Sequence, residues 1–295
     1  MHSWVSVLGL LVAAVPETLA SCAYGTHLHP RAAAFEAPKF GYDATKGPVN
    51  WYNLDPVANA LCGHGHNQSP INLAGNNFKI VPAKNLKIKI PDFKEGAEFE
   101  NLGTTVEVVA KGGNIEVDGS KYTLQQFHFH LPSEHLEDGD SMAMEMHMVW
   151  TNAKNEIAVI GVFIDLNDNA ALSLPFKSKA RSKIDSTPSA VIEAVLGSVD
   201  KIATPGSTTH TKPLAMSEIV KLLNSGSFQS YSGSLTTPPC HEGVKWFVST
   251  QKISISTRTY RKAGNVIGFN ARYPQNAPGQ ENLLDLYADA SEHVH

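Results

Sequence analysis

Three histidines stand in two segments with alternating side chains, and their spacing suits a metal site. The first segment, 126–130, reads Gln-Phe-His-Phe-His, and the second, 144–149, reads Met-Glu-Met-His-Met-Val. Side chains two residues apart in a strand share a face, so His128 and His130 point to one side and the phenylalanines to the other. If the second segment is a neighbouring strand, His147 brings a third imidazole to the same place.

This set of ligands predicts Zn2+. Three neutral imidazoles with one open position hold catalytic zinc, whereas softer metals favour thiolates, and all the cysteines are distant in the sequence. The second ring nitrogen of each histidine ligand needs an acceptor that orients it. Gln126 shares the face of His128 and Glu145 shares the face of His147, so we expect these two side chains to be acceptors.

The spacing permits other interpretations. A single His-x-His on a strand is more often structural than metal-binding. The histidine pair, followed by Glu134, also resembles the metal site of a cupin, in which Glu134 would be a ligand. However, Tyr122 and Ser141 stand where the cupin motif has glycines, and no Pro-x-Gly precedes His147.

The elements that must position these residues are mainly strands. Alternating or continuous apolar patterns predict strands at 86–90, 104–109, 114–117, 157–164 and 252–256, with a turn at Gly112-Gly113. Helical spacing predicts helices at 190–196 and 217–224, ending at Gly197 and Gly226. We therefore expect a mainly β (α+β) fold, a single domain on a large twisted, mostly antiparallel sheet with a few short peripheral helices.

Composition narrows the class of protein. The 295 residues are 42% hydrophobic and 18% charged, which is typical of a globular protein. The net charge of −4 shows no excess of basic residues of the kind that binds nucleic acid. Residues 1–20 are typical of a signal peptide, because Val5–Val15 is apolar but too short to span a bilayer, and Thr18-Leu19-Ala20 offers a cleavage site. No later segment is long and apolar enough for a membrane span, so we expect a protein secreted to the extracellular or cell-wall space.

Several motifs, in order along the chain, resemble the alpha-class carbonic anhydrases, and the resemblance runs from about Phe40 to Tyr287. These motifs are Gln68-Ser69-Pro70-Ile71-Asn72, the two histidine segments, Ser133-Glu134-His135, the loop Ser234-Leu235-Thr236-Thr237-Pro238-Pro239, and Asn270-Ala271-Arg272. The resemblance implies reversible, zinc-dependent hydration of carbon dioxide to bicarbonate and a proton, with weak esterase activity. It implies a domain plan of signal peptide 1–20, lead-in 21–39 and catalytic domain 40–290.

The resemblance also assigns roles. His128, His130 and His147 would hold zinc. Thr236 would accept a hydrogen bond from zinc-bound hydroxide and donate its own proton to Glu134, while Thr237 would help bind bicarbonate. An apolar wall for carbon dioxide would consist of Val149, Val159, Leu235, Val244 and Trp246.

Secreted members of this family pair cysteines at positions matching Cys62 and Cys240, so the resemblance implies a disulfide bond between these two residues. Export favours a disulfide, and an odd count leaves one cysteine over. Cys22 is that residue, and it is a candidate bridge to a second copy in a homodimer.

One position departs from the family pattern. Fast members carry a proton-shuttling histidine in an Asn-x-Gly-His context, and this chain has Thr104 there, after Gly103. Tyr42 matches a tyrosine that orders pocket water, and His241, expected at the pocket rim, could relay protons instead. A non-catalytic carbonic-anhydrase-like binding domain is the main alternative function, but such domains usually lack a ligand histidine, and this chain has all three.

Overall fold

The computed structural model describes residues 24, 26, 35–167 and 187–292. The predicted signal peptide, Cys22 and most of the predicted lead-in lie outside the described residues. Within the described part of the chain, no helix is long and apolar enough to cross a membrane.

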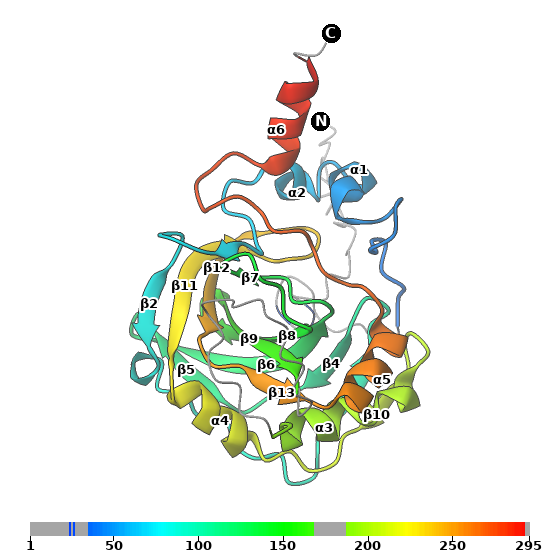
Figure 1. Ribbon diagram of the computed structural model, residues 1–295, viewed down its shortest axis with the longest axis vertical. Coiled ribbons are helices and arrows are strands. Elements are labelled where there is room, and N and C mark those ends of the chain that lie inside the picture. Colours follow the sequence, from blue (N-terminus) through cyan, green and yellow to red (C-terminus); the bar gives the residue numbers. More distant parts are fainter. Residues whose placement is uncertain (1–23, 25, 27–34, 168–186, 293–295) are drawn as a thin grey trace, which may run out of the picture.

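A large, strongly curved sheet forms the centre of the molecule (Figure 1). Its main path has the strand order β10-β3-β4-β6-β8-β9-β12-β11-β2, with β5 paired to β6 and β13 paired to β9. A separate small sheet pairs β1 with β7 in parallel. The strands are β1 Asn72–Leu73, β2 Lys79–Pro82, β3 Glu98–Asn101, β4 Val106–Val109, β5 Asn114–Val117, β6 Ser120–His130, β7 Leu136–Glu137, β8 Met144–Asn152, β9 Ile157–Leu166, β10 Thr208–His210, β11 Ser227–Ser234, β12 Glu242–Ser249 and β13 Ile253–Ile255.

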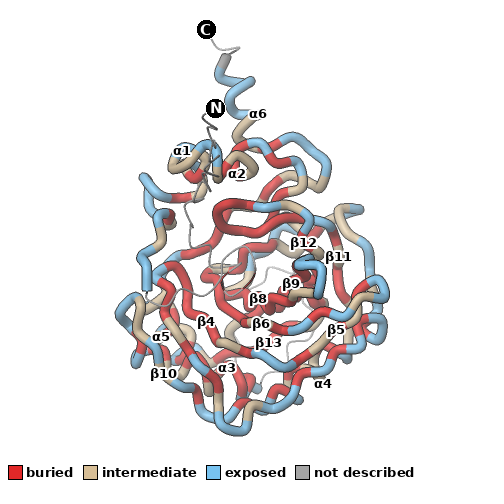
Figure 2. Tube along the Cα trace, turned by 180° about the vertical axis from the view of Figure 1, so that it is seen from behind, coloured by how far each residue is buried: buried red, intermediate tan, exposed pale blue. Residues whose placement is uncertain are grey.

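The predicted fold class is confirmed. Within the large sheet, β9 pairs in parallel with β12 and β13, and the other described pairs are antiparallel. The helices are short and lie at the periphery: α1 Trp51–Leu54, α2 Ala60–His64, α3 Ala190–Leu196, α4 Met216–Asn224, α5 Thr257–Ile267 and α6 Leu283–Glu292. In Figure 1, α6 projects from the body beside α1 and α2, and in Figure 2 its outer part is exposed while the central strands are buried.

The two faces of the sheet carry different residues because strand side chains alternate. On one face, Phe127, Phe129 and the methionines of β8 join the main apolar core, which also takes in buried residues of α3 and α4. The histidines of β6 and β8 therefore point to the opposite face. The strand β9 is central between two neighbours and buried along most of its length, which explains its uninterrupted apolar sequence.

The predicted strand at 86–90 is wrong. Leu86, Ile88 and Ile90 are buried and the lysines between them exposed, as the alternation required. However, Leu86 has helical backbone angles and Lys87 has a positive φ of 46°, so the segment is not extended, and only an isolated bridge joins Lys89 to Asn114. Alternating burial is thus produced here by an irregular coil.

Candidate metal centre

The register of two central strands assembles the three histidines. In the antiparallel pair β6–β8, His128 is directly opposite His147, and His130 follows two residues later on the same face. All three side chains are fully buried. One nitrogen from each ring lies within 4.8 Å of the others, and the ring centroids are separated by 4.5 to 5.4 Å. The expectation that the two segments are neighbouring strands is confirmed.

Each ring has one nitrogen oriented by a neighbour. His128 Nδ1 lies 2.8 Å from Gln126 Oε1, and His147 Nε2 lies 3.0 Å from Glu145 Oε1. His130 Nδ1 lies 2.8 Å from the main-chain oxygen of Asn270. Both side chains expected from the shared strand faces lie next to these nitrogens, although the contact of His147 Nε2 with Glu145 does not have hydrogen-bond geometry. The third acceptor is a backbone atom 140 residues away.

The remaining nitrogens are suited to a cation. Among the described residues, His130 Nε2 and His147 Nδ1 are buried and have no hydrogen-bond partner. Buried polar atoms without a partner are costly, and a metal ion bound between these rings would satisfy them. The donor set is therefore chemically consistent with zinc.

Burial holds the imidazoles in the neutral form that a metal requires. Removal from water, together with the neighbouring imidazoles, lowers the pKa of His128 well below its usual value. The same causes lower the pKa of His130 to about 3, and burial also lowers the pKa of His147. The three rings are therefore uncharged at neutral pH.

Glu145 contacts neighbouring groups of the site through both of its carboxylate oxygens. Oε1 lies 2.8 Å from His135 Nδ1, and Oε2 accepts hydrogen bonds from the backbone amides of Glu134 and His135. Burial acts to raise the pKa of Glu145, but its contacts with His135 and His147 hold that pKa well below the usual value. His135, Glu145 and His147 also form a second group of convergent metal-type atoms, but these atoms already pair with one another.

Glu134 lies beside the histidines and contacts the predicted active-site loop. Its Oε1 accepts a hydrogen bond from the backbone amide of Arg272, and the Thr236 side chain also hydrogen-bonds this carboxylate. Its Oε2 lies 3.5 Å from His130 Nε2 and 3.8 Å from His147 Nδ1. Burial raises the pKa of Glu134 well above its usual value, against the opposing effect of the two hydrogen bonds.

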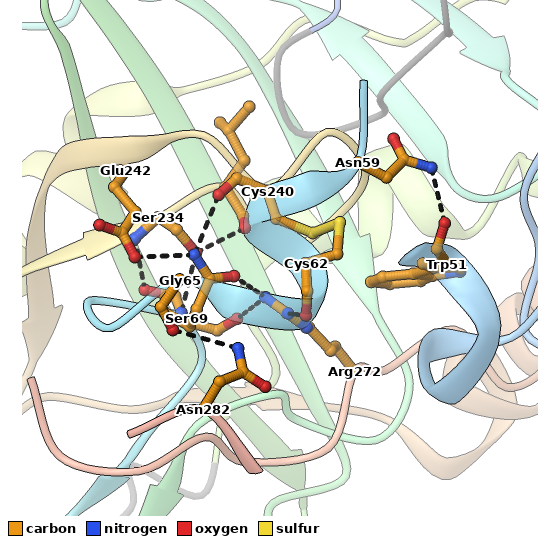
Figure 3. The surroundings of a disulfide bond; sticks show 12 residues. Trp51, Asn59, Cys62, Gly65, Ser69, Ser234, Cys240, Glu242, Arg272 and Asn282 are labelled. Carbon is orange, nitrogen blue, oxygen red and sulfur yellow. Dashed lines mark hydrogen bonds between the residues drawn. A yellow bond between two sulfur atoms is a disulfide. The ribbon is translucent and has the colours of Figure 1, made fainter. Parts of the chain in front are cut away.

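The loop that carries Thr236 is anchored at its far end by a disulfide. The predicted Cys62–Cys240 bond is present, and both sulfur-bearing residues are buried. Figure 3 shows how Arg272 approaches this region, where its Nη2 donates to the Cys62 carbonyl oxygen. Gln68 Nε2 donates to the Cys240 carbonyl oxygen. Thr236 and its neighbour Thr237 are fully buried within the loop.

The predicted apolar wall is a single cluster. Its members are each no more than 2% exposed and pack together on the face opposite the main core: Val149, Val159, Leu235, Val244 and Trp246. The Trp246 ring lies 4.8 Å from the His147 ring. An apolar surface therefore adjoins the histidine cluster.

The residues expected near the proton-shuttle position lie in two different parts of the structure. Thr104 and Tyr42 both line a cavity of about 510 Å3, together with Phe40 and Phe269. Asn270 Nδ2 donates to the Thr104 carbonyl oxygen, which links this cavity to the residue that orients His130. His241 is exposed where the loop rejoins β12, and its carbonyl oxygen accepts from the Leu235 amide.

Comparisons with known proteins agree with this arrangement. A family profile described as eukaryotic-type carbonic anhydrase matches residues 46–282. A carbonic anhydrase of Pectobacterium carotovorum is 30% identical over 80% of this chain and 86% of its own length, and one of Nostoc is 30% identical over 83% of each. A fungal alpha carbonic anhydrase from Aspergillus oryzae superposes with a TM-score of 0.75 at 35% identity, covering 84% of this chain and 98% of that one.

The chain belongs to the alpha, or eukaryotic-type, family of carbonic anhydrases. It is an enzyme of the carbonate dehydratase class, whose general reaction is the hydration of carbon dioxide. The cupin interpretation is wrong, because both the sheet and the profile belong to a different family.

Proposed function

We propose that the chain binds one Zn2+ through His128, His130 and His147 and uses it to interconvert carbon dioxide and bicarbonate, with weak esterase activity. The observation that carries this proposal is the pair of buried, unpartnered nitrogens on His130 and His147. Their opposite ring nitrogens lie 2.8 Å from the main-chain oxygen of Asn270 and 3.0 Å from Glu145 Oε1, the second as a close contact without hydrogen-bond geometry. Such a site is oriented for a cation before the cation binds.

The metal, when bound, would supply a Lewis acid that lowers the pKa of water to about 7. We assign the remaining tasks to this chain's own side chains. Glu134, as the acceptor from Thr236, would fix the direction of the Thr236 hydroxyl, so that its lone pair faces the site. Thr237 would help to bind bicarbonate. The cluster around Trp246 would exclude water and receive the apolar substrate.

We also propose a secreted enzyme, with residues 1–20 as signal peptide and 40–290 as the catalytic domain. The disulfide Cys62–Cys240 supports an oxidising compartment. Cys22 remains a candidate for a covalent bridge between two copies.

One experiment tests the activity and its metal together. The full secreted chain is assayed for carbon dioxide hydration by stopped flow as purified, after zinc removal with a chelator, and after zinc is restored. We expect about one zinc per chain, loss of hydration on removal and recovery on addition. His128→Ala, His130→Ala and His147→Ala should each abolish hydration and lower zinc content, whereas His210→Ala, an exposed residue on β10, is the matched control. Full activity in any ligand variant would refute the site.

A non-catalytic binding domain is the remaining alternative. Domains of that kind usually lack a ligand histidine, whereas the three imidazoles, Glu134 and Thr236 come together in this chain. A protein that holds zinc but fails to hydrate carbon dioxide would support the alternative.

A further inference from the structure

A groove in the surface lies away from the histidines and takes no part in the function proposed above. It has a volume of about 740 Å3 and lies where β11 and β12 meet the edge strand β2 and the turn between β5 and β6, a region labelled in Figure 1. Lys245 and Phe247 of β12 line this groove. They alternate with Val244 and Trp246, which belong to the apolar wall beside the histidines. Successive side chains of a strand point to opposite faces, so the groove opens on the face that the histidines do not occupy.

The register of three strands places two serines among longer side chains in this groove. Ser230 of β11 is directly opposite Lys79 of β2 on one side and Phe247 of β12 on the other. Ser232 is directly opposite Lys245. Directly opposite residues have their side chains on the same face of a sheet. The two small hydroxyl-bearing side chains therefore lie between longer ones, which leaves the surface hollow at this place.

Several polar side chains around the groove are free to bind a ligand. In the part of the chain that the structure describes, five lining side chains make no hydrogen bond or ion pair with the protein and are exposed or half-buried: Asn76, Lys79, Asn85, Ser230 and Ser232. They supply amide, hydroxyl and ammonium groups, which offer both hydrogen-bond donors and acceptors. The lining also includes buried members of the main apolar core: Leu86, Val117 and Phe247. The groove thus combines an apolar floor with a polar rim.

The charged groups of the groove balance one another. Lys245 Nζ lies 3.0 Å from Asp118 Oδ2, and this ion pair joins β12 to the turn between β5 and β6. Glu116, at the end of the same hairpin, pairs with Lys87 at 2.8 Å. The lysines at 79 and 245 are therefore matched by the carboxylates at 116 and 118. This arrangement favours a neutral ligand over an anion or a cation.

We propose that this groove binds a neutral oligosaccharide of a few sugar units. Its volume suits a small molecule, since ligand sites usually measure roughly 300–1,000 Å3. Most such sites are lined mainly by apolar side chains, whereas the polar rim of this groove matches a ligand with many hydroxyl groups. A pyranose ring has C–H groups on its faces and hydroxyls around its edge. It can therefore lie on the apolar floor while its hydroxyls exchange hydrogen bonds with the amides and serines of the rim.

The test measures sugar binding by the full zinc-loaded chain. Calorimetry follows titration with four neutral pentasaccharides: cellopentaose, maltopentaose, laminaripentaose and chitopentaose. We expect saturable binding of at least one of them with a dissociation constant below about 1 mM. Ser232→Leu fills the groove at an exposed position and removes a hydroxyl, so it should weaken this binding by about fivefold or more. Ser291→Leu, the same change at an exposed position of α6, is the matched control and should bind like wild type.

The loss of affinity in Ser232→Leu relative to Ser291→Leu decides the outcome. A loss of about fivefold or more supports the inference. A smaller loss, or no saturable binding of any of the four sugars up to about 10 mM, overturns it. Tighter binding of the anionic sugar pentagalacturonate than of every neutral one would overturn the choice of a neutral ligand.

Two further measurements keep the result unambiguous. If Ser232→Leu fails to fold, Asn76→Ala and Asn85→Ala replace it, because both side chains are exposed and each change removes only an amide. Each should weaken binding about threefold, and unchanged affinity in both would overturn the inference. Carbon dioxide hydration tests the proposed function separately, and we expect it to be unchanged in Ser232→Leu.

Discussion

The main-chain oxygen of Asn270 lies 2.8 Å from Nδ1 of His130, although the two residues are 140 positions apart in the chain. The Asn270 side chain secures this contact. Its Oδ1 accepts from the Leu131 amide, and its Nδ2 donates to the carbonyl oxygens of Thr104 and Phe129. One buried amide thus aligns His130 with the strand that carries it.

Loss of this amide should weaken both the fold and the metal site. Asn270→Ala leaves buried backbone groups unpaired, and we expect the free energy of unfolding to fall by about 1–3 kcal/mol. Zinc affinity should fall by roughly 10- to 100-fold, as for other residues that orient ligands. Urea unfolding and competition with a zinc chelator measure the two effects. Asn276→Ala, which removes a side-chain hydrogen bond to the Glu281 carbonyl far from the histidines in sequence, is the matched control. Unchanged zinc affinity in Asn270→Ala would contradict the assignment.

Glu134 should be needed for turnover and not for metal binding. Glu134→Gln keeps the size of the side chain but no longer fixes the direction of the Thr236 hydroxyl, and misorientation of this kind can cost on the order of 100-fold in rate. We expect full zinc content with a loss of that size in stopped-flow hydration. Thr236→Val should lose a similar factor, and the double variant little more, because the two residues act as a unit. Release of zinc from Glu134→Gln would show that its carboxylate is itself a ligand.

The disulfide should stabilise the chain and the catalytic loop together. Cys62 and Cys240 are separated by 178 positions, and closing so long a loop contributes roughly 2–4 kcal/mol to the free energy of unfolding. Cys240 also closes the loop through its amide, which donates to the Thr237 carbonyl oxygen. We expect Cys62→Ser with Cys240→Ser to unfold at lower urea concentration and to lose activity before it unfolds. Cys22→Ser is the control, and a linked Cys62–Cys240 peptide in a non-reducing digest checks the bond directly.

Acid should destabilise the zinc-free protein through its buried histidines. The folded-state pKa of His130 is about 3, below its ordinary value near 6.5, and those of His128 and His147 are also lowered. The unfolded chain therefore binds more protons between these limits, so stability is full above about pH 6.5 and falls as the pH decreases toward about 3. Urea unfolding of zinc-free protein at pH 7 and pH 5 measures this slope. His130→Gln should reduce the slope and His210→Gln, at an exposed position, should not.

The histidine cluster could be predicted from sequence because its residues obey local rules. Side chains that alternate with a period of two place Gln126 on the same face as His128 and His130. The same alternation places Glu145 on the same face as His147. The backbone partners of His130 and Glu134 could not be found this way, since the Asn270 carbonyl and the Arg272 amide are brought in by the tertiary fold. The position of Glu107 beside His128 depends on the register of β4 against β6, which no local pattern specifies.

The prediction of helices and strands likewise depended on how clear the local sequence pattern was. The strand at 157–164 and the helix at 190–196 carry uninterrupted apolar or helical patterns, and both are present, the helix with the expected Gly197 at its end. The helix α5 was missed, although Ser256 caps its first turn and Gly268 follows its last residue. Its apolar residues Tyr260, Ala263 and Ile267 lie at helical spacing and belong to or pack against the main core, so periodicity and the capping residues together could have predicted this helix.

The rate of turnover should be limited by proton transfer, because Thr104 cannot titrate near neutral pH. Recombination of a proton with its conjugate base is at most diffusion-limited, on the order of 10¹⁰ M⁻¹s⁻¹. For a site water with an acid constant of about 10⁻⁷ M, unaided proton release is then on the order of 10³ s⁻¹. A fast carbonic anhydrase turns over at about 10⁶ s⁻¹, so buffer should accelerate this enzyme. Thr104→His should raise the rate in weak buffer and leave the rate constant at low substrate nearly unchanged, since attack on carbon dioxide does not use the shuttle.

Stopped-flow assays over a series of buffer concentrations check both statements, and His241→Ala tests whether that exposed residue relays protons instead. A wild-type rate near the fast limit that does not respond to buffer would show that another group already carries the proton.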